Sequence, residues 1–491
     1  MVDAPADRAW GYVHRMLDRG NRMGVLSHAK LGLRQQVRCD SVPGREASRR
    51  LPVRCRVMHR TFLGSIFRTL CVMVLLALGG PALSHADTGD ELTVSLLTLS
   101  PGQHPFARFG HIEIWIHNAA ARVDDALMRD PVYNFGNFTF NDPALIPKFL
   151  LGRFVYWLGK EPITQRMQYA RRLGRTLHAQ ELYLTAAEKR ALRDTLEENL
   201  REENRYYKYD YYRDNCATRV RDVIDRILHG KLRAVAQGPA AMTWRAHTLR
   251  LTAEDPLLSL ALTGVLAGFT DRPITQWQEM FLAPYIQMAV RRVQVPGPDG
   301  APRSLVASER SLVESPQPVV VRTEAPGWLL QLLTIGVLAG ALFFAVARAA
   351  AQSGVARMGL AILLVVCTLL SAGGVFLIFV WFLTDHEACH RNENILQLMP
   401  LGVVLLGLCT RAARLDRIAL ARVRTLLACA AVSALFGAAW KVLPWMRQDN
   451  VWIIALCAPT WIGGALGLSA LERSMAVGQS MGSRSDEADR R

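Results

Sequence analysis

Between residues 87 and 326 the sequence contains a single cysteine, Cys216. A disulfide within that segment is therefore excluded, because a bridge needs two thiols. The segment also lacks an apolar run of the roughly 20 residues that a membrane span needs, so it is expected to fold as a soluble domain. No internal repeat and no low-complexity tract is visible anywhere in the chain.

Acidic residues are fewer than basic ones, with 42 Asp and Glu against 58 Lys and Arg and a formal net charge of +16. This balance raises the question of nucleic-acid binding, but the basic residues form no single patch. Residues 1–57 hold eleven Arg and one Lys against five acids, and a second arginine cluster occupies residues 410–425 between two apolar runs. We interpret residues 1–57 as a leader and residues 410–425 as a cytoplasmic loop. We therefore expect no nucleic-acid partner.

Hydrophobic residues make up 51% of the chain, which is too many for a purely soluble enzyme. Five apolar runs follow the soluble domain, at residues 328–347, 360–383, 395–408, 426–443 and 451–471. Arginine is frequent in the loops 348–359 and 409–425 and rare in the loops 384–394 and 444–450. By the positive-inside tendency, we expect a multi-pass protein of the bacterial inner membrane whose soluble domain and loop 384–394 face the periplasm.

The segment before the soluble domain has the features of a secretory signal peptide. Arg60 and Arg68 precede a short apolar core, and Ser84 and Ala86 are spaced for cleavage. Translation from Met58 is one interpretation, and an uncleaved anchor with a cytoplasmic leader is the other. The expected organisation is a basic leader (1–57), a signal peptide (58–86), a periplasmic catalytic domain (87–326), a transmembrane domain (327–472) and a cytoplasmic tail (473–491).

Patterns within the soluble domain predict strands first and helices later. Alternating β-branched and aromatic residues predict strands at 91–100, 111–117 and 131–140. Thr185 and Glu188 form a capping box before a predicted helix, and a second helix is predicted from Cys216 to Leu228, capped by Asp214 or Asn215. The fold class is therefore α+β, followed by an all-α transmembrane domain of about five helices.

Cys216 is the candidate nucleophile, because amide groups at a helix start stabilise a thiolate. A buried inert cysteine and a bridge to Cys389 are the alternatives. A thiolate also needs a general base, for which His104, His111, His117 and His178 are available. A cysteine helix packed on a histidine strand is the papain-like arrangement, and a histidine that comes first in the chain is typical of permuted members.

A third group should orient the imidazole, and Asn134 is the candidate by analogy with papain-like sites, with Glu113 and His117 as rivals. Asn215 or backbone amides near Cys216 could stabilise an oxyanion.

The apolar segment 145–159 is suited either to lying in a membrane interface or to forming a core helix.

Three stretches carry a family resemblance: HPFARFGHIEIWI, YNFGNFTF and ENRYYKYDYYRDNCATRVRD, in which DNCATR is the most specific part. They resemble the Lnb family of bacterial lipoprotein N-acyltransferases over about residues 91–300, and TDHEACHRNENIL resembles the outer membrane loop of that family. The resemblance implies Cys216 as nucleophile and His111 as its partner. It also implies a phospholipid acyl donor, a lipoprotein acceptor and no cofactor.

The polar loop 384–394 is expected to lie over the mouth of the thiol site and to help bind a substrate. Its candidate residues are Asp385, His386, Asn392 and Asn394. The loop could chemically hold zinc, but its spacing matches no closed motif, so no metal is expected. A cell-envelope cysteine hydrolase or amidase and a non-catalytic membrane scaffold are the alternative functions.

Overall fold

An antiparallel sheet forms the centre of the first domain in the computed structural model, which describes residues 88–139 and 142–489. Seven of the described strands pair in the order β6-β4-β3-β2-β1-β5-β9. Their bounds are β1 (Leu92–Leu99), β2 (His111–Asn118), β3 (Pro131–Asn137), β4 (Val155–Pro162), β5 (Leu177–Leu182), β6 (Tyr206–Lys208) and β9 (Val306–Val313). The short strands β7 (Gln294–Pro296) and β8 (Pro302–Ser304) form a hairpin. The predicted leader and signal peptide lie outside the described residues.

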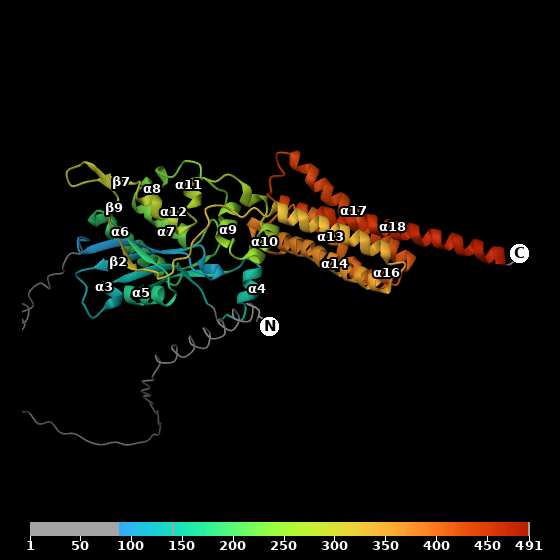
Figure 1. The fold of residues 1–491 in the computed structure, drawn as a ribbon. Coiled ribbons are helices and arrows are strands. Elements are labelled where there is room, and N and C mark those ends of the chain that lie inside the picture. Colours follow the sequence, from blue (N-terminus) through green and yellow to red (C-terminus); the bar gives the residue numbers. More distant parts are fainter. Residues whose placement is uncertain (1–87, 140–141, 490–491) are drawn as a thin grey trace, which may run out of the picture. The chain divides into compact units, whose positions relative to one another are not determined.

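Helices cover both faces of this sheet (Figure 1). On one face, Ile112, Ile114 and Ile116 of β2 are buried in a core that also contains the apolar side of α7. On the other face, a smaller core includes residues of α5. The helices of this domain are α3 (Ala126–Arg129), α4 (Leu145–Leu150), α5 (Ile163–Arg172), α6 (Ala186–Leu200), α7 (Cys216–Ile227), α8 (Lys231–Ala234), α9 (Trp244–Thr252), α10 (Pro256–Val265), α11 (Gln276–Glu279) and α12 (Ala283–Val290).

The structure confirms the α+β class and the local signals behind it. The three predicted strands correspond to β1, β2 and β3, although β3 ends at Asn137. Helix α6 begins with the predicted capping box of Thr185 and Glu188. Helix α7 is capped by Asn215, whose side chain accepts hydrogen bonds from the next turn, and not by Asp214.

The apolar segment 145–159 does not form one continuous helix, either at an interface or in the core. Only Leu145–Leu150 are helical, in α4. The chain then turns at Gly152, which has a φ of +69°, and continues as β4 from Val155. A positive φ ends the helix because it suits glycine and breaks the right-handed repeat. The exposed apolar side chains of α4 remain at the surface.

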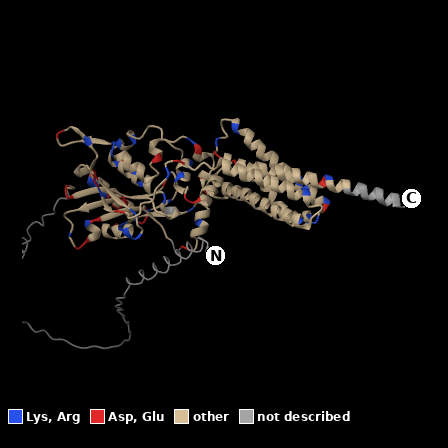
Figure 2. Ribbon diagram, in the orientation of Figure 1, with Lys and Arg blue, Asp and Glu red and all other residues tan. Residues whose placement is uncertain are grey.

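Five helical segments after this domain are long and apolar enough to cross a membrane. They comprise α13 (Leu329–Ala349), α14 (Gly354–Leu383), α15 (Ile395–Leu398) with α16 (Leu405–Ala413), α17 (Arg417–Ala439) and α18 (Val451–Asp489). The third segment is broken at Met399, which has a φ of +34°, and continues through a 3-10 turn at Pro400–Val404. Figure 2 shows few charged residues along the length of α13 and α14. Helix α18 also continues through most of the segment that was expected to be a tail.

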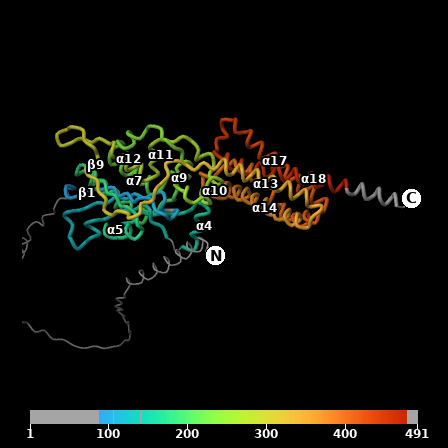
Figure 3. Tube along the Cα trace, viewed as in Figure 1, coloured from blue at the N-terminus to red at the C-terminus, as the bar shows by residue number. Residues whose placement is uncertain are grey.

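The sheet domain and the helical membrane region share a core. Tyr212 and Phe281 of the first are buried in one cluster with Val380 of α14 and Cys389 of the loop that follows it. Figure 3 follows the trace of α4 to a position beside the end of α14, where the Asp385 N–H donates to the Leu151 carbonyl at 2.8 Å. Loop 384–394 is therefore packed directly against the domain that carries Cys216.

Candidate functional site

Cys216 is the first residue of α7 and follows a tightly hydrogen-bonded turn. Asp210 and Asp214 exchange backbone hydrogen bonds of 2.9 and 3.1 Å, and the Asp210 carboxylate accepts from two N–H groups inside the turn. The Asn215 side chain then accepts from the N–H groups of Ala217 and Thr218, both at 2.9 Å. This network fixes where α7 begins, and with it the position of the Cys216 thiol.

His111 lies between the thiol and an asparagine. Its Nδ1 is 3.0 Å from the Cys216 Sγ, and its Nε2 is 2.9 Å from the Asn134 Oδ1. The Asn134 Oδ1 also accepts the Gly136 N–H at 2.6 Å, which holds the amide in place. The three residues come from α7, β2 and β3, and their order of contact is that of a thiol, base and orienting group.

A buried ion pair lies behind His111. Glu113 and Arg166 of α5 are both almost fully buried, and the Arg166 Nε is 2.6 Å from the Glu113 Oε2. The other carboxylate oxygen is 3.1 Å from the His111 Nε2, close enough for charge attraction but not aligned for a hydrogen bond, since the ring N–H points to Asn134. Burial alone would raise the pKa of Glu113, but the positive charge of Arg166 outweighs it and lowers that pKa.

The charge state of His111 follows from these neighbours. Burial favours the neutral ring, but the negative charge of Cys216, the hydrogen bond to it and the nearby Glu113 raise the pKa of His111 to about 10. The imidazole therefore holds its proton at neutral pH while it contacts the thiol.

Gly136 makes room for the His111 ring. A Cβ at this position would come within 2.4 Å of the His111 Cε1 and 3.1 Å of the Asn134 Oδ1. The contact with the ring is shorter than any real Cβ contact, so the ring would have to move. Gly136 was not singled out from the sequence, although it lies within the stretch YNFGNF.

We expect Gly136→Ala to displace the imidazole from Cys216. The rate at which a thiol reagent labels Cys216 at neutral pH should fall about a hundredfold, the typical consequence of a 1 Å misplacement in a catalytic group. Stopped-flow labelling with an apolar maleimide measures this rate. Gly327→Ala is the matched control, since a Cβ there meets no atom within 4 Å and Gly327 is not among the glycines with a positive φ. Equal labelling rates in the two variants would contradict the proposed role of Gly136.

Several tyrosines lie near enough to the thiol for its charge to influence their pKa values. Tyr156 and Tyr209 pack against the same core cluster as Cys216, and their rings stack at 4.2 Å. Burial, followed by the charge of Cys216, raises the pKa of Tyr156. The Tyr207 hydroxyl donates to the Phe135 carbonyl on β3 at 2.6 Å. These side chains give the thiol a largely apolar environment that the sequence pattern alone did not indicate.

Loop 384–394 contacts the sheet domain through polar side chains. The Lys208 Nζ is 2.8 Å from the Asp385 Oδ2, and the Arg153 Nε is 3.4 Å from the same oxygen. The His386 Nε2 donates to the Phe149 carbonyl at 2.8 Å. In this structure Asp385 and His386 therefore attach the loop to α4 and β6, and their predicted role in substrate binding stays a prediction.

Three other residues that were predicted to bind substrate make hydrogen bonds within the protein, and their role in substrate binding stays a prediction. Asn392 and Asn394 are buried, and their amide groups donate to backbone carbonyls at residues 263–265, at the C-terminus of α10. Helix ends leave carbonyls without partners, and these two side chains satisfy them. Asn215 is also buried: its oxygen caps α7, and its nitrogen donates to the Tyr211 and Phe281 carbonyls. A substrate would have to break these bonds to reach the three amides.

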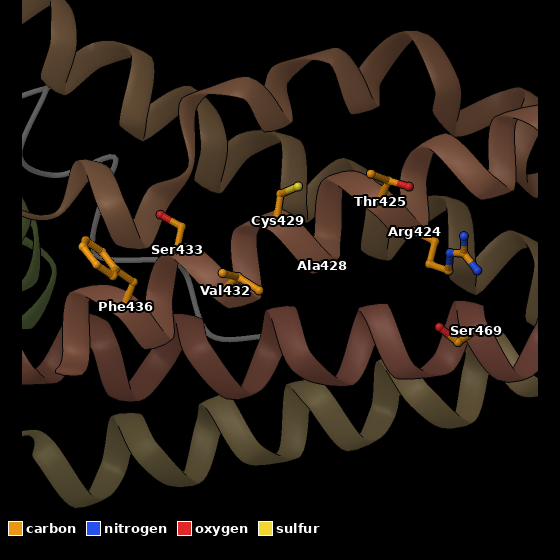
Figure 4. Close-up of a pocket in the computed structure, with 8 residues that line it drawn as sticks. All are labelled: Arg424, Thr425, Ala428, Cys429, Val432, Ser433, Phe436 and Ser469. Atoms are coloured by element: carbon orange, nitrogen blue, oxygen red, sulfur yellow. The ribbon is translucent and has the colours of Figure 1, made fainter. Parts of the chain in front are cut away.

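His117, a rival orienting group, lies near the other end of β2. Its Nδ1 is 2.7 Å from the Asp130 Oδ1. Both line a hollow of about 610 Å³ that contains Trp115 and several residues of β1, β5 and β9. Figure 4 shows a second groove, of about 660 Å³, which follows one side of α17 past Cys429. Neither hollow is lined by Cys216, His111 or Asn134.

The bridge to Cys389 is not formed. Both Cys216 and Cys389 are free cysteines, and burial raises the pKa of the Cys389 thiol to about 12. Within residues 88–139 and 142–489, no cluster of three or more His, Cys, Asp or Glu side chains could hold a metal ion. Cys216 keeps a free thiol beside His111, whereas Cys389 is buried in the core that the sheet domain shares with the membrane helices.

The fold and the site define a multi-pass membrane protein whose α+β domain carries a Cys-His-Asn arrangement. Residues 82–250 match the family model described as the Lnb N-terminal periplasmic domain, and this match supports an Lnb-type family assignment. No curated protein matches the chain, and no solved structure does. The match includes all three residues of the arrangement and ends before the membrane helices.

Proposed function

We propose that this protein is an acyltransferase of the bacterial inner membrane, with its catalytic domain in the periplasm. It moves an acyl chain from a phospholipid, through a thioester on Cys216, to the N-terminal amine of a lipoprotein. The observation that carries the proposal is the contact of the His111 ring with both Cys216 (3.0 Å) and Asn134 (2.9 Å) in a domain that packs on apolar membrane helices. A thiol site attached to a membrane suits substrates that are themselves lipids.

In the first half-reaction the Cys216 sulfur attacks the ester carbonyl of the phospholipid. The carbonyl oxygen becomes an oxyanion in the tetrahedral intermediate. We assign the backbone N–H of Cys216 as one donor to it, because the N–H groups of Ala217 and Thr218 already donate to Asn215. The C–O bond then breaks, the leaving alkoxide takes the proton from His111, and a lysophospholipid departs. The acyl group remains on sulfur as a thioester.

In the second half-reaction the lipoprotein amine attacks the thioester carbonyl. His111 is neutral after the first step and accepts the proton that the amine loses. The C–S bond breaks, the sulfur leaves as a thiolate beside the protonated ring, and the product is an amide. Asn134 keeps Nε2 of the ring engaged in both steps, so that Nδ1 stays directed at the reacting atoms.

The test is mass spectrometry of lipoprotein N-termini from cells that express the protein or its variants. The wild-type chain should add an amide-linked acyl chain, which increases the mass by that of one fatty acid less water. Cys216→Ser should leave the N-terminal amine free, because an oxygen nucleophile at this position lacks the acidity of a thiol. Cys429→Ser, at an exposed cysteine of α17, is the matched control and should retain acylation.

Two outcomes would overturn the proposal. Lipoproteins with free N-termini in cells that contain active, folded wild-type protein would exclude the lipoprotein as acceptor. Release of free fatty acid from phospholipid without any amide product would instead identify a lipid hydrolase.

A further inference from the structure

A row of aromatic rings extends away from Cys216. The Tyr209 and Tyr156 rings stack at 4.2 Å, and the Phe154 ring follows at 5.3 Å from that of Tyr156. The ring centroids of Phe138 and Phe149 lie 5.4 Å and 6.4 Å from the ring centroid of Phe154. Tyr209, Tyr156, Phe154 and Phe138 are only partly buried, so this aromatic row lines a surface instead of filling the core.

The far end of the aromatic row lies in α4, whose apolar side chains are exposed. Ile146 is 67% exposed, Phe149 48% and Leu150 45%. A soluble surface rarely exposes three neighbouring large apolar side chains to water in this way. α4 has six residues and cannot span a membrane, but its length suits a shallow position in the interface.

Loop 384–394 fixes α4 at the end of a membrane helix. The His386 ring donates to the Phe149 carbonyl, and the Asp385 N–H donates to the Leu151 carbonyl, both at 2.8 Å. A Cβ on Gly152 would lie 3.0 Å from the backbone of the same two loop residues, so the two segments touch. α14 ends at Leu383, immediately before this loop.

The exposed side of α4 is therefore continuous with the lipid-facing side of α14. Phe382 and Leu383, the last residues of α14, are both mostly exposed, as expected for side chains that contact lipid. This continuity identifies the lipid bilayer as the partner of α4. It also gives the aromatic row one end in the membrane interface and the other beside the thiol.

We propose that α4 lies in the outer leaflet and that the aromatic row from Phe149 to Tyr209 binds the acyl chain of a membrane lipid on its way to Cys216. The inference rests on the proposed acyltransferase function and names the path of its acyl donor. A chain that leaves the bilayer for water loses favourable burial with every methylene. Contact with successive rings replaces that burial until the ester reaches the sulfur.

The first test locates α4 in the membrane. The photoreactive residue benzoylphenylalanine replaces Ile146 in the full chain, reconstituted in nanodiscs of phosphatidylethanolamine. Illumination should yield phospholipid adducts at this position. The matched control places the same residue at Val123, which is more exposed than Ile146 but follows the far end of β2. Equal lipid adducts at the two positions, or none at Ile146, would overturn the placement of α4.

The second test concerns the aromatic row. Formation of the Cys216 thioester is followed by intact-protein mass spectrometry with palmitoyl and butyryl ester donors. Phe154→Ala should lower the ratio of the palmitoyl rate to the butyryl rate about tenfold, which corresponds to lost contact with roughly two methylenes. Phe138→Leu keeps an apolar side chain and should also lower this ratio. It therefore tests the aromatic row even if Phe154→Ala does not fold.

Trp157→Ala is the matched control for the aromatic row. Trp157 lies on β4 beside Tyr156, and successive side chains of a strand point to opposite faces. Its ring contacts Tyr206 instead of the aromatic row. The ratio should stay at the wild-type value in this variant, and equal falls in Phe154→Ala and Trp157→Ala would overturn the acyl path. A wild-type protein that forms no thioester from any ester would overturn the proposed function, whereas a thioester without chain-length effects refutes this inference alone.

Discussion

Cys216→Ser and His111→Gln should each abolish acylation of the purified protein by phospholipid. The rate at which the protein gains an acyl group should fall by at least about 10³-fold, as the reaction rate does when one member of a nucleophile and base pair is removed. The reason is the 3.0 Å contact between the His111 Nδ1 and the Cys216 Sγ, since both proton transfers in the proposed cycle go through the His111 ring. Intact-protein mass spectrometry measures the gain of one acyl group.

His178→Gln is the control for His111→Gln. His178 lies on β5, and its Nε2 is 3.2 Å from the Glu309 Oε2. Its replacement should leave thioester formation at the wild-type rate. A double variant of Cys216 and His111 should be no slower than either single variant, because the two residues act as one unit. Additive losses would show that they contribute independently, and would contradict the proposed mechanism.

Arg166→Met should have the largest effect on stability. It leaves the Glu113 carboxylate buried without its partner at 2.6 Å, a change that typically costs about 3–5 kcal/mol. Because the pKa of Glu113 is lowered in the folded state, the stabilisation from the ion pair is present above pH 4.5, the ordinary value, and is lost as the pH falls. Urea unfolding of the detergent-solubilised protein at pH 7 and at pH 4 should show a much smaller difference between wild type and variant at the lower pH.

The double variant Glu113→Gln with Arg166→Met separates loss of the ion pair from loss of packing. It removes the unpaired charge, so its free energy of unfolding should recover most of the loss seen in Arg166→Met. A double variant as unstable as the single one would show that Arg166 acts by packing alone. Thioester formation in the double variant then reports whether Glu113 also holds His111 in place, because the His111 Nε2 lies 3.1 Å from its carboxylate.

Local signals in the sequence determined most of the secondary structure around the site. The capping box at Thr185 and Glu188 and the start of α7 at Cys216 depend on side chains within three residues of each other. The alternation along β2 placed Ile112, Ile114 and Ile116 on one buried face. Five helices for the membrane followed from apolar length alone. In each case, interactions between near neighbours decide the outcome.

The contacts between distant residues depended on the tertiary structure. Arg166 is 53 residues from Glu113 and has no local pattern that marks it as a partner, and Gly136 matters only because the His111 ring lies against it. The same applies to Asn392 and Asn394, which look like surface loop residues but cap α10, more than 120 residues earlier in the chain. The family resemblance suggested that Cys216 and His111 act together. Their separation, the buried ion pair behind them and the aromatic row toward α14 required the packing of the sheet on α5, α7 and the membrane helices.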